Sequence, residues 1–409
     1  MNIQMIGIDH TTAPVEIREK FSFTTKVQAA LMEQAAALPG VLGVILLSTC
    51  NRTELWVHCR PDVEPPLCDC ICQIAGTGTE QYRDRLRSRR GEEAVAYLFG
   101  MTSGLRSQIF GEDQILTQVK EALDKARTAL HTDTVLEVLF RMAITAAKKV
   151  KTGMQTATAD TGAGGYCLER LRGEGYAFTG RRCLVIGNGK MGKLAAQALR
   201  QAGAHVTVTV RQYRSGVVEI PVGCERIDYG RRMELLPDCD MVVSATTSPN
   251  TTMKYQDVSA AVWKPGLIFL DLAVPRDIDP RIAELPGVRL FDIDSFHAPQ
   301  SEERTRMEEE AQVVLAQQIQ EFLTWYDCRD RIPMTNELAE KCAVDFLVRV
   351  EPAIRQTHLD SEAASALRVQ LEDAAKKHFR RLLFAVRDEA GAAAFRQCLD
   401  AMEKFYDQA

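Results

Sequence analysis

The segment from residue 187 to residue 192 has the residue types and spacing of a phosphate-binding turn. It follows the apolar run 183–186 and precedes an expected helix at 193–202. Gly187 permits a tight turn, Gly189 lets backbone N–H groups approach a pyrophosphate, and Gly192 lets the helix pack on the strand. Between a strand and a helix this pattern predicts a dinucleotide site, with a plain turn as the alternative. The residues of the segment are Gly187, Asn188, Gly189, Lys190, Met191 and Gly192.

Two arginines, Arg211 and Arg214, follow the next expected strand at 206–210. At this place an NAD site has an Asp or Glu that binds the ribose 2′-hydroxyl, whereas cations suit a 2′-phosphate. The sequence therefore favours NADPH over NADH. A solvated loop is the alternative interpretation of the two arginines.

A cysteine lies where another apolar strand ends. Cys50 follows the run 44–47 and is flanked by Thr49, Asn51 and Arg52. A side chain at the carboxyl end of a strand is exposed while its backbone is fixed, and the cation of Arg52 would favour a thiolate. An inert cysteine is the alternative. A thiolate combined with a nicotinamide can form a thioester and reduce it by hydride transfer.

Hydrophobic periodicity divides the chain into three regions that must position these residues. The first region has strands at 1–10 and 41–59 around an alanine-rich helix, which is a β-α-β-type unit. Its expected helices cover residues 26–38, 93–101, 114–129 and 135–151. The glycine-rich run 162–165 is the first strong break after them.

The second region alternates short apolar strands with helical or turn-rich segments, which predicts a parallel doubly wound sheet. Its expected strands cover residues 183–186, 206–210, 241–245 and 267–270. The third region starts with a long spine helix near residue 301, followed by helices at 335–357, 361–387 and 389–407. We therefore expect an α/β multidomain chain with an α+β domain at 1–155, a Rossmann-like domain at 156–298 and an all-helical end at 299–409.

Composition excludes several classes of protein. The 409 residues suggest two or three domains, and the net charge of −5 means that a nucleic-acid partner would need a local basic patch. No apolar run approaches the ~20 residues that span a bilayer, and Met1 to Met5 lack the features of a secretory signal. We therefore expect a cytoplasmic protein without a membrane segment.

The cysteines do not predict a metal site. Twelve cysteines are spread along the chain, and we expect them to be reduced. The cluster Cys68, Cys70 and Cys72 lacks the spacing of a structural zinc site. We expect no metal.

Six motifs, in order along the chain, carry a resemblance to a known family. The matching segments are residues 7–21, 47–54, 103–120, 185–192, 244–249 and 271–280. Together they resemble glutamyl-tRNA reductase, the enzyme that reduces glutamyl-tRNA to glutamate-1-semialdehyde at the start of the five-carbon tetrapyrrole (porphyrin, haem) route. The resemblance implies a catalytic and glutamyl-recognition domain at 1–155, an NADPH domain at 156–298 and dimerisation through 299–409.

The resemblance also implies roles for single residues. Cys50 corresponds to the nucleophile that attacks the aminoacyl ester, expels tRNA and leaves a glutamyl thioester. The residues at positions that hold the glutamyl group are Thr49, Cys50, Asn51, Arg52, Ser107, Glu112, Asp113, Gln114 and Gln118. Arg52 and Glu112 agree with this role, because the carboxylate and ammonium of a glutamyl group need charged partners.

Two residues depart from the family pattern. Tyr97 stands where the family usually has a histidine, and Arg106 stands where it has an aspartate. A tyrosine with a pKa near ~10 is a poor base at neutral pH, so its part in acid–base chemistry is doubtful. Attack by a pre-ionised thiolate needs less help from a base. His10 is a second imidazole, which we interpret as a structural residue at a strand end.

The partners that the resemblance implies are glutamyl-tRNA, a second copy of the chain in a homodimer, and a glutamate-1-semialdehyde aminomutase that would take up the product. One competing interpretation is a shikimate-dehydrogenase-like reductase of a free small acid. Another is a diverged, non-catalytic paralogue that binds glutamyl-tRNA or a pathway partner, which Tyr97 and Arg106 encourage. The retained Cys50 and glycines favour the enzyme.

Overall fold

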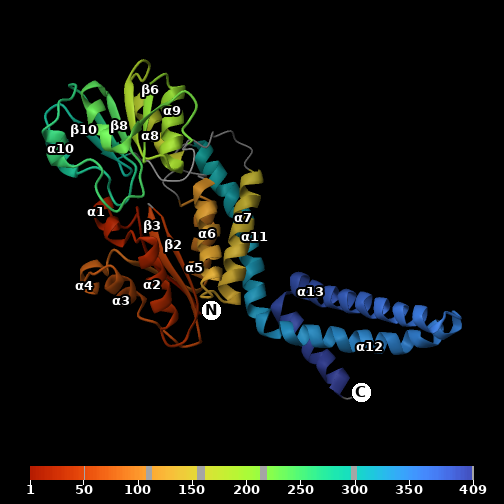
Figure 1. The fold of residues 1–409 in the computed structure, drawn as a ribbon. Helices are drawn as coiled ribbons and strands as arrows, with labels where there is room; N and C mark the ends of the chain where they lie inside the picture. The colour runs from red at the N-terminus through yellow and green to blue at the C-terminus, as the bar shows by residue number, and fades with distance from the viewer. Residues whose placement is uncertain (50, 107–112, 154–161, 212–218, 296–301, 408–409) are drawn as a thin grey trace. The chain divides into compact units, whose positions relative to one another are not determined.

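The computed structural model describes residues 1–49, 51–106, 113–153, 162–211, 219–295 and 302–407. Its contacts divide the chain into two compact units, Met1–Leu315 and Ala316–Ala409. The boundary falls within helix α11, Glu302–Cys328 (Figure 1).

The amino-terminal part of the first unit is built on a four-stranded antiparallel sheet. Strands β1 (Ile3–Asp9), β2 (Val41–Ser48), β3 (Arg52–Cys59) and β4 (Arg87–Arg90) lie in the order β2-β3-β1-β4. Since β1 and β2 both pair antiparallel with β3, they run in the same direction. The expected β-α-β unit is therefore present, with β3 inserted between its two strands.

Helices cover both faces of this sheet, which explains why its inner strands β1 and β3 are buried along their whole length. Val44 and Leu46 pack in a core with helices α2 (Thr25–Ala36) and α3 (Leu67–Ile74). Ile45 and Leu47 point to the other face because side chains alternate along a strand. That face is covered by α5 (Gly91–Thr102), α6 (Asp113–Thr128) and α7 (Thr134–Gly153) (Figure 1). Helices α1 (Val15–Arg18) and α4 (Thr79–Tyr82) are short.

The second sheet has the predicted doubly wound topology. All of its neighbouring strands are parallel, in the order β10-β9-β8-β5-β6-β7. The strands are β5 (Arg182–Ile186), β6 (His205–Val210), β7 (Glu225–Asp228), β8 (Met241–Ser244), β9 (Ile268–Asp271) and β10 (Arg289–Asp292). The strand order reverses at β5, and ligands of such sheets bind at this switch point, beyond the carboxyl ends of the strands.

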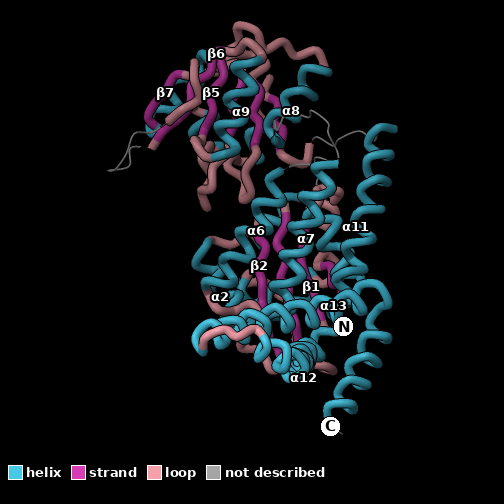
Figure 2. The backbone as a smooth tube through the Cα atoms, turned by 90° about the vertical axis from the view of Figure 1, so that its right-hand side faces the viewer, coloured by secondary structure: helices cyan, strands magenta, loops and turns pink. Residues whose placement is uncertain are grey.

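Helices α8 (Gly162–Gly173) and α9 (Lys190–Gln201) share one core with this sheet (Figure 2). Helix α10 (Tyr255–Ser259) and the 3₁₀ segments Tyr229–Asp238 and Pro280–Glu284 pack on the other core. The glycine-rich run 162–165, which the sequence suggested as a break, forms the first turn of α8 instead.

The second unit is helical. After a 3₁₀ turn at Arg329–Arg331, helices α12 (Ile332–Gln356) and α13 (Ser361–Asp407) lie side by side (Figure 1). Gly391, with φ of 82°, interrupts α13 near the expected division between two helices. Cys328, Leu338 and Phe395 belong to the small core of this unit. Within the described residues, no helix is long and apolar enough to cross a membrane.

Candidate active site

The turn after β5 has the geometry of a dinucleotide-binding loop. Gly187 has φ of 108°, and a Cβ atom there would lie 2.5 Å from the carbonyl oxygen of Ala245. A Cβ at Gly192 would lie 2.0 Å from the carbonyl oxygen of Gly187. Gly189 caps α9, and a Cβ there would meet no atom within 4 Å. The first and third glycines are thus required by the fold, whereas the space at Gly189 is open to a ligand.

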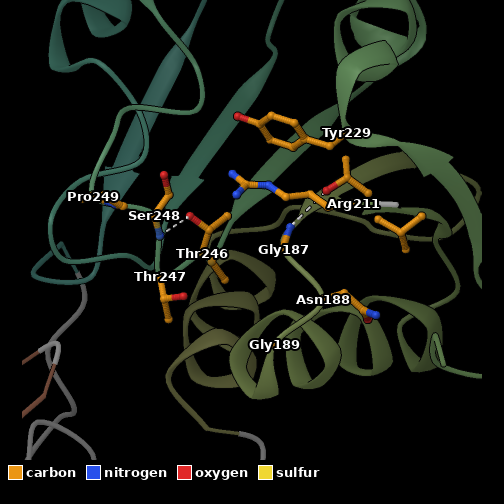
Figure 3. A pocket seen from close by; sticks show the side chains of 12 residues that line it. Gly187, Asn188, Gly189, Arg211, Tyr229, Thr246, Thr247, Ser248 and Pro249 are labelled. Atoms are coloured by element: carbon orange, nitrogen blue, oxygen red, sulfur yellow. Dashed lines mark hydrogen bonds between the residues drawn. The ribbon is translucent and has the colours of Figure 1, made fainter. Parts of the chain in front are cut away.

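This turn lines a cavity of about 530 Å³ at the switch point of the sheet. Gly187, Asn188 and Gly189 form one wall, and residues 245–249 form another (Figure 3). The Arg211 guanidinium lies over the ring of Tyr229, with 4.8 Å between the Cζ atom and the ring centroid. The residues and the open space fit a pyridine dinucleotide. Arg214 lies outside the described residues.

An aspartate that the sequence analysis gave no role organises the wall opposite the glycine turn. One oxygen of Asp277 accepts hydrogen bonds from Ser244 Oγ and Thr246 N, both at 2.8 Å. Its other oxygen accepts one from Thr246 Oγ1 at 2.6 Å. Burial raises the pKa of Asp277 above its ordinary value, although these hydrogen bonds oppose the shift. The only sequence signal was its place in the motif 271–280.

A second cavity, of about 650 Å³, brings the predicted substrate residues beside the cofactor turn. Ser48, Thr49, Gln114 and Gln118 line it together with the segment 189–191. The amide of Gln114 donates to Met191 Sδ at 3.2 Å. Lys190 and Met191, which the sequence predicted to bind the nucleotide, thus line this second cavity.

An arginine joins the cofactor sheet to the amino-terminal part near this cavity. The side chain of Arg276 donates twice to Glu19, at 3.0 and 3.1 Å, and once to Glu16 at 2.8 Å. The neighbouring residues Val274 and Pro275 line the second cavity. These ion pairs fix the wall formed by the segment 272–275.

The turn between β2 and β3 is held by its own polar groups. The hydroxyl of Thr49 accepts hydrogen bonds from the backbone N–H groups of Asn51 and Arg52, each at 3.2 Å. The side-chain oxygen of Asn51 accepts one from Arg18 at 3.2 Å. Thr49 and Asn51 therefore shape the turn that carries Cys50. Cys50 itself, Ser107 and Glu112 lie outside the described residues, as does the side chain of Asp113.

Arg52 is buried and its charge is already paired. Its guanidinium donates to Glu54 at 3.1 Å, to the Tyr97 hydroxyl at 2.9 Å and to the carbonyl oxygen of Arg106 at 3.0 Å. The sequence suggested that this cation would favour a thiolate at Cys50. The structure places it against the carboxylate of Glu54, while its charge still acts on the neighbouring His10.

Tyr97 is a hydrogen-bonding residue of this cluster. Its hydroxyl donates to Glu54 at 2.6 Å, and it lies 3.3 Å from an oxygen of Asp9. Burial, with a contribution from the charge of Glu54, raises the pKa of Tyr97 above its ordinary value. Tyr97 therefore stays protonated and cannot replace a histidine as a base.

His10 lies beside the same turn. Its backbone N–H donates to the carbonyl oxygen of Asn51 at 3.2 Å. Burial, followed by the charge of Arg52, lowers the pKa of His10 to about 4. Its Nδ1 atom is buried and has no hydrogen-bond partner within the described part of the chain. The imidazole is thus neutral at physiological pH.

The described cysteines do not form a metal site. No group of three potential ligands that could hold a metal ion occurs among the described residues. Cys70 and Cys72 are buried in α3. Burial raises the pKa of Cys70 to about 11.

Family models match two parts of the chain. The model "Glutamyl-tRNAGlu reductase, N-terminal domain" matches residues 6–154, and the model "Shikimate / quinate 5-dehydrogenase" matches residues 171–298. The first match covers the sheet with the β2–β3 turn, and the second covers the glycine turn. The fold and site therefore define a multidomain dehydrogenase with a pyridine-nucleotide domain.

Similar proteins of known name identify the family within this class. A glutamyl-tRNA reductase from Acetivibrio thermocellus is 39% identical over 337 residues, which is 82% of this chain and 100% of the relative. One from Alkaliphilus oremlandii is 39% identical over 73% of this chain and 89% of the relative. The solved glutamyl-tRNA reductase from Methanopyrus kandleri covers 98% of this chain and 99% of its own, with 24% identity and a TM-score of 0.44. The chain belongs to the glutamyl-tRNA reductase family.

The cluster around Arg52 makes Tyr97→Phe a test of the tyrosine hydroxyl. The substitution leaves a buried donor of Arg52 unsatisfied and removes a short hydrogen bond to Glu54. We expect the free energy of unfolding to fall by about 1.5–3 kcal/mol, measured by urea denaturation. Tyr176→Phe is the control, because its hydroxyl makes only a 3.4 Å contact with the Asp240 carbonyl. Equal, small effects of the two substitutions would show that the Tyr97 hydroxyl does not hold the cluster.

The raised pKa of Asp271, at the end of β9, predicts that the free energy of unfolding depends on pH. Burial raises its pKa from 3.8 to about 7, although it accepts backbone hydrogen bonds from Ala273 and Ile278. Between these values the folded chain holds a proton that the unfolded chain releases, so Asp271 lowers stability as pH rises from about 4 to 7.

Asp271→Asn should remove this contribution, which is at most about 1.4 kcal/mol per pH unit. The measurement is urea unfolding at several pH values between 4.5 and 7.5. The exposed Asp257→Asn is the control. If wild-type and Asp271→Asn stabilities ran parallel over this range, the raised pKa of Asp271 would be wrong.

Proposed function

We propose that this chain reduces glutamyl-tRNA to glutamate-1-semialdehyde with NADPH and releases the tRNA. One observation carries the proposal: Ser48 and Thr49, which precede Cys50, line the same cavity as the glycine turn. This shared cavity supports reduction of a thioester on Cys50 by a nicotinamide bound beside the glycine turn. The family supports the same reaction.

In the first step, the Cys50 thiolate attacks the ester carbonyl carbon. A carbon–sulfur bond forms, the ester carbon–oxygen bond breaks, and the tRNA leaves as its 3′-terminal alcohol after taking a proton. The residues proposed to hold the glutamyl group are Thr49, Asn51, Arg52, Ser107, Glu112, Asp113, Gln114 and Gln118. Of these, Thr49, Gln114 and Gln118 line the cavity, which supports their role.

In the second step, the thioester is reduced. NADPH, when bound, supplies a hydride to the thioester carbonyl carbon. The carbon–sulfur bond then breaks, which releases the aldehyde and returns the Cys50 thiolate. Asp277 holds the Thr246 segment against the cofactor cavity, and the Arg276 ion pairs hold the neighbouring wall. Asn188, Lys190 and Met191 complete the proposed cofactor site with the three glycines.

Arg52 has a positioning role in this proposal. Because Glu54 pairs with its charge, Arg52 offers the glutamyl group directed N–H donors rather than a free cation. His10, neutral and adjacent to the turn, is better suited than Tyr97 to exchange a proton there.

We propose that the second unit forms a homodimer. Its helices α12 and α13 expose large apolar side chains, which mark interaction surfaces in soluble proteins. These are Val344, Phe346, Val348, Val369, Leu382 and Phe405.

The functional division we propose is a catalytic domain at 1–155, an NADPH domain at 156–298 and a dimerisation domain at 299–409. We further propose cytoplasmic activity and transfer of the reactive aldehyde to a glutamate-1-semialdehyde aminomutase.

Cys50→Ser tests the covalent step. A hydroxyl has a far higher pKa than a thiol, so the variant should lose reduction of glutamyl-tRNA but still bind NADPH. The half-buried Cys224→Ser is the control and should stay active. Without NADPH, the wild type should carry a glutamyl adduct on Cys50, visible by mass spectrometry. Most activity remaining in Cys50→Ser would exclude the thioester, and an inactive wild type would favour the non-catalytic paralogue.

Replacing Arg211 and Arg214 together with alanine tests the cofactor. Losing charge-assisted contacts to a 2′-phosphate costs about 1.5–3 kcal/mol, so NADPH should bind roughly tenfold or more weakly while NADH binding hardly changes. Binding is measured by calorimetry. Arg226→Ala, exposed on β7, is the control. Equal losses for both cofactors would show that these arginines do not bind the phosphate.

A further inference from the structure

A third cavity adjoins the cofactor cavity on the nucleotide domain. It measures about 630 Å³ and shares Tyr229 with the cofactor cavity. Its lining includes two tyrosine rings, Tyr229 and Tyr255, and three cations, Arg232, Lys254 and Arg281. Aromatic rings next to cations are the side chains that bind phosphorylated nucleosides.

The three cations are not equivalent. The charge of Arg281 is paired, because its Nε and Nη2 atoms donate to Asp279 at 3.0 and 2.6 Å. Lys254 is exposed, so salt screens its charge. Only Arg232 is half-buried and, among the residues that the structure describes, has no carboxylate partner.

The position of Arg232 is nevertheless fixed. Its Nε and Nη2 atoms donate to the carbonyl oxygen of Thr252 at 3.0 and 2.8 Å, and Nη1 donates to that of Tyr229 at 3.0 Å. Carbonyl groups orient the guanidinium without cancelling its charge. The Arg232 Cζ atom also lies 4.2 Å from the centroid of the Tyr229 ring.

Tyr229 connects this fixed cation to the cofactor cavity. Its ring contacts both Arg232 and Arg211. Figure 3 shows Tyr229 beside Arg211, the residue that follows β6. Tyr229 itself follows β7, which pairs with β6, so the two strand ends lie next to each other. In a dinucleotide fold, the ribose 2′ substituent lies at the end of the strand that follows the glycine turn and its helix, which here is β6.

We propose that Arg232, held against Tyr229, is a determinant of the cofactor's 2′-phosphate, acting together with Arg211. The assignment rests on the proposed use of NADPH. Both guanidinium groups contact the Tyr229 ring, which lines both cavities. A cation that no carboxylate pairs within the described residues attracts a phosphate dianion much more than a hydroxyl. A ligand without the 2′-phosphate should gain no affinity from Arg232.

The experiment compares two fragments of the cofactor on the intact chain. Adenosine 2′,5′-bisphosphate carries the extra phosphate, and adenosine 5′-monophosphate lacks it; both are titrated by calorimetry. Arg232→Leu should weaken binding of the bisphosphate by about tenfold and leave the monophosphate unchanged. Arg232→Lys should restore part of the difference, because it keeps the charge.

Two matched controls are available in the chain. Arg231→Leu removes the neighbouring charge, which is exposed and paired with Glu234, and should change neither affinity. Arg281→Leu alters the same cavity but removes a paired charge, and should also leave the ratio of the two affinities unchanged.

The outcomes separate this assignment from the proposed cofactor. Equal weakening of both fragments by Arg232→Leu, or no weakening of either, would overturn the role of Arg232. A wild type that prefers the bisphosphate while Arg232→Leu keeps that preference would overturn Arg232 alone and leave NADPH in place. A wild type that does not distinguish the two fragments would overturn both.

Discussion

The buried ion pair between Arg52 and Glu54 is the interaction on which the amino-terminal site depends. A charge taken out of water needs a partner and further hydrogen bonds to be tolerated. Residues two apart on a strand point to the same face, so β3 supplies both members of the pair. Tyr97 of α5 and the carbonyl of Arg106 complete it. The pair thus attaches α5, and the chain beyond it, to the strand that begins just after Cys50.

The nucleotide domain also contains a buried carboxylate, that of Asp277, which is stabilised by hydrogen bonds. The hydrogen-bond donors to Asp277 are hydroxyl and backbone N–H groups of the strand end and the following loop. Those hydrogen bonds fix the Thr246 segment opposite the glycine turn. Both halves of the site are therefore shaped by a buried acid: Glu54 is hydrogen-bonded to a guanidinium, and Asp277 is hydrogen-bonded to hydroxyl and backbone N–H groups.

Much of the fold follows from the sequence, because the inner strands and the glycine turn carry strong local signals. The parallel strands contain the apolar runs 183–186 and 241–243, as expected for strands covered on both faces. The expected division between helices at 361–387 and 389–407 is present too, displaced to Gly391. Strands β4, β7 and β10 were missed because they are short and polar, and each lies at the edge of its sheet.

The site was less predictable, because its character comes from contacts between distant segments. Nothing local shows that the charge of Arg52 is paired by Glu54, or that a tyrosine 45 positions away donates into that pair. Likewise, Arg232 resembles any other charged residue until the structure shows that its guanidinium donates to carbonyl groups and, within the described ranges, pairs with no carboxylate. Periodicity reports burial, whereas the pairing of charges depends on tertiary structure.

The burial of the cysteines affects how readily the thiols of this chain are oxidised. Eight of the eleven described cysteines are buried, and burial raises the pKa of Cys59 and Cys70 to about 11 and of Cys167 and Cys183 to about 12. Since peroxide and disulfides react with the thiolate, these side chains resist oxidation while the chain is folded. We therefore expect oxidation of these cysteines to require local unfolding that exposes them.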